Sequence, residues 1–173
     1  MKRTGEFTVN IALVRGGRPV AGVVHAPALG KSWVAGEATV PSCGTAETRS
    51  AARSAARRPR PARVVASRDH AGPEVRALLE RLPGAETLSM GSSLKFCLIA
   101  EGKADLYLRD GPTMEWNTGA AQAVLEAAGG GVFTLEGERL PYGKPELRNP
   151  KFVAAGDPEL DWTRSSQRLT DPS

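Results

Sequence analysis

Hydrophobic residues near the start of the chain form short, almost continuous runs with little regular alternation. Three such runs, FTVNIALV, VAGVVHAP and SWVAGEATV, are separated by GGRP and by further Gly and Pro residues. This pattern predicts three strands joined by tight turns over residues 7–40. Because runs such as IALV and VAGVV are typical of strands covered on both faces, we expect these strands to lie inside a layered α/β structure.

Strand-like and helix-like segments alternate in the second part of the chain. RVVAS predicts a short buried strand, and PEVRALLERL carries apolar residues at the spacing of one helical face, at Val75, Leu78, Leu79 and Leu82. The alternation continues with a strand in ETLSM, a helix in GSSLKFCLIAEG, a strand in ADLYLR, a helix in MEWNTGAAQAVLEAAGG and a strand in GVFTL. The fold class predicted is therefore α/β, with layered sheets and helices.

One segment differs in composition from the rest. Between Arg49 and Arg68 there are seven arginines and no Asp or Glu. Pro59 and Pro61 would end any helix there, so we predict an exposed connector over 49–63. Its charge could contact nucleic-acid phosphates, but it contains no interleaved aromatic residues, which disfavours nucleic acid as a partner.

Overall composition fits one globular domain, with 40% hydrophobic and 24% charged residues among 173 and a net charge of +4. We place this domain at 1–156 and expect 157–173 to be a frayed tail. No apolar run has the length of a membrane span, and MKRTGEFTVN lacks the apolar core of a secretory signal. We expect a cytoplasmic protein, with a peripheral position at the inner membrane as the alternative.

The two cysteines, Cys43 and Cys97, are far apart and belong to no CxxC motif. This spacing argues against a disulfide framework and against a structural zinc site. We expect both to be reduced thiols.

The segment GSSLKF is a candidate phosphate site. It places Gly91, Ser92 and Ser93 at the start of a predicted helix, with Lys95 one turn further. Unpaired N–H groups at a helix start, two hydroxyls and an ammonium together suit a phosphate. The alternative is that serine acts as an ordinary N-cap and the lysine is solvated.

Arg109 follows an apolar strand and precedes a Gly-Pro turn. In α/β folds the carboxyl ends of strands commonly carry ligand contacts, and an arginine there can bind a phosphate with two hydrogen bonds. A surface arginine at a turn is the alternative. His70 also follows a strand, although a lone histidine is more often structural or exposed. Trp116 is interpreted as a core anchor and Asn117 as an N-cap.

Several common catalytic motifs do not occur in the sequence. There is no Walker loop, no GxSxG, no HExxH and no dense Asp/Glu cluster able to hold magnesium. The residue pattern alone therefore does not identify the chemistry.

Five segments together carry a family resemblance. GEFTVNIALV, GVVHAP, VVASRDH, GSSLKFCLIAEGKADLYLR and GPTMEWNTGAAQAVLEAAGG closely resemble the CysQ-type 3′(2′),5′-bisphosphate nucleotidases of the inositol monophosphatase-like superfamily. The resemblance extends from Lys2 to Val153, and 91–130 is its most specific part. It implies the C-terminal part of the inositol monophosphatase-like sugar-phosphatase fold, a layered sandwich of sheets and helices.

The resemblance also implies an activity. Members of this family are Mg²⁺-dependent phosphomonoesterases that convert adenosine 3′,5′-bisphosphate to AMP and phosphate, using carboxylates that hold several Mg²⁺ ions. Four positions match family contacts to the nucleotide bisphosphate: His70, Ser92, Lys95 and Arg109.

The sequence departs from the family pattern in two ways. The family's DPLDGT motif and upstream Glu, which supply most metal ligands, would precede Met1, so we expect the N-terminal portion to be missing. Asn117 stands where the family has the Asp of a WD motif, so a neutral amide replaces a charged metal ligand. Two interpretations stay open: a truncated phosphatase, or a non-catalytic nucleotide-binding remnant. We also expect oligomerisation, because the family's N-terminal half packs against this half.

Overall fold

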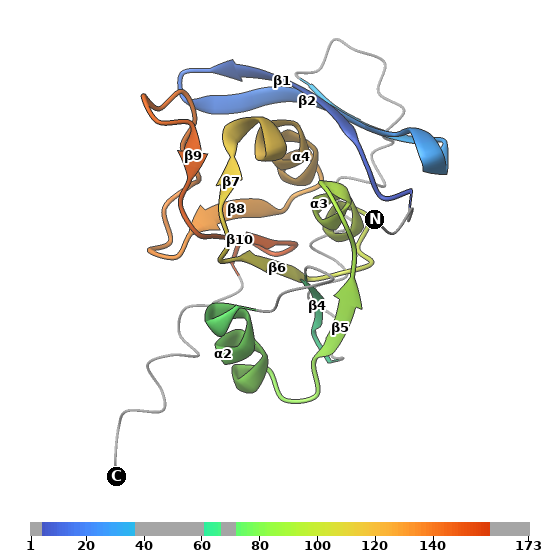
Figure 1. Cartoon of the computed structure of the whole chain (residues 1–173), viewed down its shortest axis with the longest axis vertical. Helices are drawn as coiled ribbons and strands as arrows, with labels where there is room; N and C mark the ends of the chain where they lie inside the picture. The colour runs from blue at the N-terminus through green and yellow to red at the C-terminus, as the bar shows by residue number, and fades with distance from the viewer. Residues whose placement is uncertain (1–4, 37–60, 67–71, 160–173) are drawn as a thin grey trace.

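The first sheet in the computed structural model (Figure 1) confirms the three strands predicted near the start of the chain. The structure describes residues 5–36, 61–66 and 72–159. An antiparallel sheet in the order β1-β2-β3 contains β1 (Val9–Arg15), β2 (Arg18–Ala26) and β3 (Lys31–Ala35), with a 3-10 turn, η1 (Pro27–Leu29), between the last two. The end of the third predicted strand, 37–40, lies outside the described residues.

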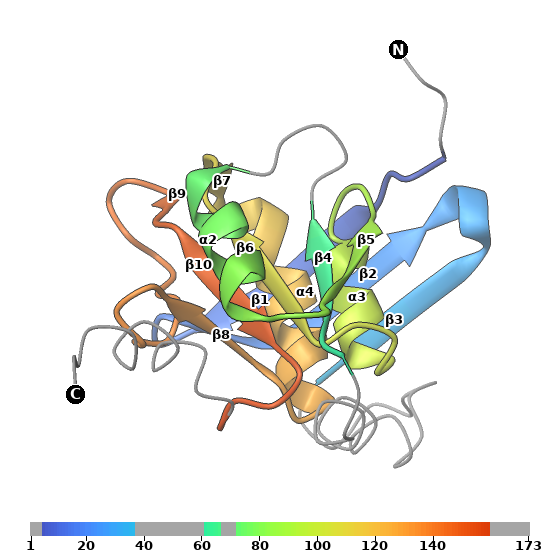
Figure 2. The same cartoon turned by 90° about the horizontal axis from the view of Figure 1, so that it is seen from below.

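A second sheet contains five strands in the order β5-β4-β6-β10-β8. Their bounds are β4 (Arg63–Ala66), β5 (Glu86–Ser89), β6 (Leu106–Arg109), β8 (Gly131–Thr134) and β10 (Phe152–Ala155). β4 pairs in parallel with β5 and β6, whereas β10 is antiparallel to both β6 and β8 (Figure 2). β7 (Thr113–Met114) and β9 (Arg148–Asn149) form a separate pair.

The described residues contain three α-helices that complete the layers: α2 (Pro73–Arg81), α3 (Leu94–Ala100) and α4 (Glu115–Ala127). α3 and α4 lie between the two sheets, and α2 lies on the outer side of the five-stranded sheet (Figure 1). Val75 and Leu78 of α2 are buried, as the helical spacing predicted. The layered sandwich expected from the strand–helix alternation is therefore confirmed. None of the described helices is long and apolar enough to cross a membrane.

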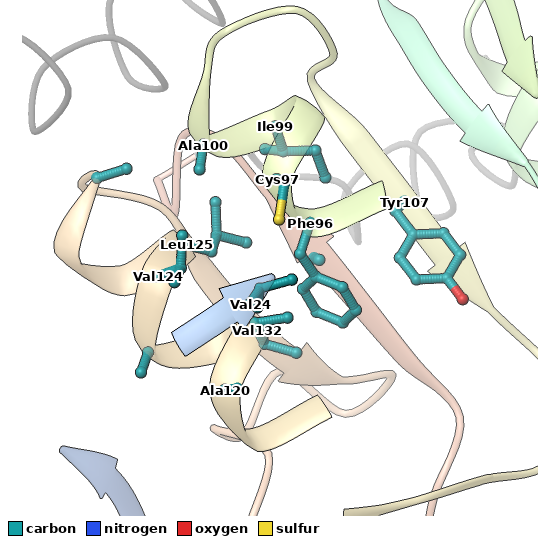
Figure 3. Packing of buried hydrophobic residues seen from close by; sticks show 14 of the residues in the cluster. Val24, Phe96, Cys97, Ile99, Ala100, Tyr107, Ala120, Val124, Leu125 and Val132 are labelled. Carbon is teal, nitrogen blue, oxygen red and sulfur yellow. The ribbon is translucent and has the colours of Figure 1, made fainter. Parts of the chain in front are cut away.

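The core lies between the sheets, around α3 and α4 (Figure 3). Phe96 packs edge-on against Tyr107 with ring centroids 5.5 Å apart, and both rings contact Phe152 of β10. Cys97 is a buried free thiol, and burial raises its pKa. The expectation of a reduced thiol is confirmed for Cys97, whereas Cys43 lies outside the described residues.

Helix α4 approaches the first sheet closely at Gly22 of β2. A Cβ atom on Gly22 would lie 2.5 Å from the carbonyl oxygen of Ala120, closer than atoms can pack. Ala120 lies in the middle of α4, so the glycine allows the helix and β2 to approach more closely than a residue with a Cβ atom would permit.

The expectation that the first strands are covered on both faces was wrong for β1. Phe7, Val9, Ile11 and Leu13 are between 50% and 66% exposed. The physical reason is that α4 packs against only one face of the first sheet, and the described residues leave the other face of β1 open (Figure 1). We call these four residues the outer β1 face.

Candidate functional site

A tight turn between β5 and α3 forms the centre of the candidate site. Ser92 adopts a φ of +52°, a left-handed conformation that is uncommon for residues other than glycine. Its hydroxyl oxygen lies 2.6 Å from the hydroxyl oxygen of Thr8, and the Gly91 N–H donates to Glu6 Oε2 at 2.7 Å. Backbone strain of this kind is concentrated at functional sites, where neighbouring contacts hold it in place.

The serine N-cap expected here does not form. α3 begins at Leu94, and Ser93 at the cap position makes no side-chain bond to the helix. The Ser93 hydroxyl instead donates to the Asn117 carbonyl oxygen at 3.0 Å, which joins the start of α3 to the start of α4. Lys95 is therefore in the first turn of α3 and lies close to the turn that precedes it.

Lys95 is buried, with 5% of its surface exposed, so the interpretation of a solvated lysine was wrong. Its Nζ donates to the Ser92 carbonyl oxygen at 3.3 Å and lies 5.1 Å from the centre of the Tyr107 ring. Among the described residues it forms no ion pair with a carboxylate. Burying an ammonium without an anion is unfavourable, so this position suits an anionic ligand.

The charge of Lys95 is set by its surroundings. Burial, with a smaller contribution from the positive charge of Arg109, lowers the pKa of Lys95 from 10.5 to about 8, whereas Glu6 acts in the opposite direction. Arg109 also acts on Tyr107: burial raises the pKa of Tyr107 to about 12, and the Arg109 side chain opposes that rise. Lys95 and Arg109 thus interact electrostatically on the same side of the second sheet.

Arg109 ends β6, as predicted, and is held in place by the turn that follows. Its Nε donates to the Gly111 carbonyl oxygen and its Nη2 to the Pro112 carbonyl oxygen, both at 3.1 Å. These bonds restrict the guanidinium while leaving other N–H groups of the side chain for a ligand. The structure therefore connects three of the predicted site residues: Ser92, Lys95 and Arg109.

Similarity to known proteins identifies the family. The sequence model of the Inositol monophosphatase family matches residues 1–167. The chain belongs to this family. The resemblance found in the sequence is therefore confirmed, and the fold agrees with it.

Individual members of the inositol monophosphatase family are similar over most of this chain. The 3′(2′),5′-bisphosphate nucleotidase CysQ of Escherichia coli K12 is 46% identical over 155 residues, which cover 88% of this chain and 61% of that protein. The enzyme of the same name from Haemophilus influenzae is 35% identical and is matched over 61% of its length. The chain thus spans about three fifths of the length of these curated relatives.

Solved structures of inositol monophosphatase family proteins also match this chain. CysQ from Bacteroides thetaiotaomicron, described as a bacterial member of the inositol monophosphatase family, matches with a TM-score of 0.73 and 34% identity over 89% of this chain and 64% of that one. An inositol monophosphatase from Zymomonas mobilis, at 23% identity and a TM-score of 0.63, supports the fold.

The remaining predicted site residues are placed differently. Asn117 lies in the first turn of α4 and is exposed; the N-cap is Met114, so the N-cap interpretation was wrong. The helix starts earlier because β7 runs directly into it. Trp116 is 60% exposed, which corrects its interpretation as a core anchor, because the buried part of α4 begins only at Thr118. His70 lies outside the described residues, as does most of the arginine-rich segment, so the nucleic-acid expectation stays a prediction.

The described residues do not by themselves fit the magnesium centre expected for the inositol monophosphatase family. Among them, no group of three or more His, Cys, Asp or Glu side chains could hold a metal ion. Asn117 would offer one neutral oxygen, which is a weaker ligand for Mg²⁺ than a carboxylate. The hydrolytic step is therefore not assigned to any described residue.

Glu6 and Thr8 contact the site, but the sequence did not indicate them. Both lie just before β1, more than eighty residues from the turn that they touch. The alternation in EFTVN could have indicated them. Glu6, Thr8 and Asn10 alternate with apolar residues, which places the three polar side chains on one face of an extended segment.

Proposed function

We propose that this protein is a Mg²⁺-dependent phosphomonoesterase that removes the 3′-phosphate of adenosine 3′,5′-bisphosphate to give AMP and phosphate. The observation that carries the proposal is Lys95, an ammonium buried beside Arg109 and without a carboxylate partner among the described residues. A phosphate group would provide the negative charge that this pair lacks. The CysQ relatives, which are named as bisphosphate nucleotidases, support this choice of substrate.

Lys95, Arg109 and Ser92 each have a binding role in this proposal. The Lys95 ammonium would bind a phosphate oxygen with the N–H groups not used by the Ser92 carbonyl. The Arg109 guanidinium would bind a second oxygen, and the Ser92 hydroxyl would donate a further hydrogen bond. His70 is proposed as a fourth contact by the family resemblance alone.

A titration of the 173-residue chain tests the proposal. Calorimetry would measure the binding of adenosine 3′,5′-bisphosphate, with adenosine as the ligand that lacks phosphates, and phosphate release would be followed with and without Mg²⁺. The proposal predicts binding of the bisphosphate only, together with release that needs Mg²⁺. If neither binding nor release occurs, the assignment is wrong.

A second candidate function is a non-catalytic module that binds nucleotide bisphosphates. It is favoured by Asn117 at the family's metal position and by the absence of a metal-binding group among the described residues. Binding of the bisphosphate without Mg²⁺-dependent phosphate release would select this function over the first.

Substituting Asn117→Asp tests the metal role of this position. If the phosphatase proposal holds, the added carboxylate should raise Mg²⁺-dependent phosphate release by about tenfold and lower the Mg²⁺ concentration needed for half-maximal rate. Initial rates over a Mg²⁺ series would measure both, with Asn117→Ser as the uncharged control. An unchanged or lower rate would count against a ligand role for residue 117.

Phosphate binding should also depend on pH. Lys95 is charged below its pKa of about 8 and neutral above it, so the affinity for adenosine 3′,5′-bisphosphate should fall as the pH rises through about 8. An ordinary lysine would lose its charge only near 10.5. Calorimetry from pH 7 to pH 10 would measure this, because the phosphates, with a second pKa of about 6, stay largely ionised over that range. Constant affinity up to pH 10 would contradict the role of Lys95.

A further inference from the structure

We propose that Glu6 and Thr8 are positioning residues, which hold the Gly91–Ser92 turn so that the Ser92 hydroxyl and the Lys95 ammonium face the phosphate. This inference rests on the proposed function, because it assigns these residues to the same binding site. Neither residue is among the four nucleotide contacts that the family resemblance implies. Their role is carried by contacts between two segments that are far apart in the sequence.

The conformation of Ser92 requires support from its surroundings. Among the described residues, Ser92 is the one non-glycine residue with a positive φ. The two bonds from the N-terminal segment act on adjacent positions of the turn: Glu6 accepts from the Gly91 N–H, and the Thr8 hydroxyl bonds to the Ser92 hydroxyl. Together they tie the turn to the N-terminal segment, and contacts of this kind can hold a strained backbone conformation in place.

Packing at Gly91 shows how closely Glu6 fits the turn. A Cβ atom on Gly91 would lie 2.8 Å from Glu6 Oε2 and 3.0 Å from Glu6 Cβ. The glycine thus leaves just the space that the Glu6 side chain occupies. Any larger residue at position 91 would displace the carboxylate from the N–H that it accepts.

A chain of hydrogen bonds also orients the Ser92 hydroxyl. The Asn10 amide donates to the Thr8 hydroxyl oxygen at 3.2 Å, and the Thr8 and Ser92 oxygens lie 2.6 Å apart. With Thr8 as the donor to Ser92, the hydrogen of the Ser92 hydroxyl would stay available for a phosphate oxygen. The hydroxyl of Thr8 would therefore set the direction in which Ser92 donates.

Glu6 has a second effect that is separable from its hydrogen bond. Its negative charge favours the charged form of Lys95, against the effects of burial and of Arg109 on β6. Glutamine at position 6 would keep an oxygen for the Gly91 N–H and would remove the charge. The substitution should therefore leave the turn in place and make Lys95 lose its proton at lower pH.

The test compares Thr8→Val, Thr8→Ser and Glu6→Gln with the wild-type chain by calorimetry with adenosine 3′,5′-bisphosphate from pH 7 to pH 10. Thr8→Val should lower the affinity by about tenfold without a matching fall in melting temperature, and Thr8→Ser, which keeps the hydroxyl, should restore it. Glu6→Gln should move the fall in affinity to lower pH. Thr87→Val, an exposed threonine of β5, is the matched control.

The outcomes separate this inference from the proposed function. If the wild-type chain binds and Thr8→Val binds equally well, the positioning role is wrong and the proposed function stands. If Thr8→Ser fails to restore affinity, or if affinity falls only together with melting temperature, the contact is merely structural and the inference is overturned. If the wild-type chain does not bind the bisphosphate, the proposed function fails, and this inference fails with it.

Discussion

Replacing Lys95 with methionine is expected to weaken the binding of adenosine 3′,5′-bisphosphate by roughly 10- to 100-fold, which corresponds to the loss of a charge-assisted hydrogen bond. Methionine preserves an unbranched stem of similar length in the space beside Tyr107, so the packing should be kept. It also removes a charge that burial disfavours, since burial is the main cause of the lowered pKa of Lys95. The variant should therefore be at least as stable as the wild type and still bind poorly.

Weaker binding without a loss of stability would distinguish a binding role of Lys95 from a structural one. Calorimetry at pH 7 would measure the affinity, and thermal unfolding would measure the stability of the same samples. Lys103→Met is the matched control, because Lys103 is exposed and pairs with Glu101. Affinity that is unchanged in Lys95→Met would show that the ligand binds elsewhere, whatever the stability of the variant.

The 173-residue chain is expected to self-associate through the outer β1 face. Phe7, Val9, Ile11 and Leu13 are at least half exposed, and the cross-strand partners of the last two, Val23 and Ala21, continue the apolar surface onto β2. β1 is also an edge strand of its sheet, with main-chain groups that can pair with another chain. Exposed apolar surfaces of this kind favour association in water.

A charged double substitution tests this expectation. Light scattering coupled to size-exclusion chromatography should show dimers or larger species for the wild-type chain and a monomer for the Ile11→Lys/Leu13→Lys variant. Leu147→Lys, at an exposed leucine outside β1 and β2, is the control and should associate like the wild type. A wild-type chain that is a monodisperse monomer with cooperative unfolding would contradict the prediction.

Local sequence patterns were sufficient for most elements. The apolar runs near the start correspond to β1, β2 and β3, and the spacing in PEVRALLERL corresponds to α2. These features are local, because strand and helix periodicity is present in consecutive residues. β10 was not predicted, although Phe152 and its neighbours are fully buried at an inner position of the five-stranded sheet. Its four residues are too few to show a period, and only pairing with β6 and β8 identifies them as a strand.

The sequence indicated the chemistry of the site through residue types and family resemblance. Ser92, Lys95 and Arg109 were selected as phosphate contacts, and the structure connects these three residues. Membership of the inositol monophosphatase family was also recognisable from motifs in the chain and is confirmed by the match over residues 1–167. Family motifs consist of residue types in a fixed order along the chain. The amino-acid sequence is therefore enough to recognise the family and the residues that match its contacts.

By itself, then, the sequence determined the family, the layered α/β class and the candidate phosphate contacts. Only the tertiary structure decided that Lys95 is buried, that Trp116 is exposed and that Glu6 and Thr8 hold the Ser92 turn. The physical reason is that burial and hydrogen bonding between distant segments depend on how sheets and helices pack. A lysine in the first turn of a helix has the same local sequence whether it faces water or the ring of Tyr107.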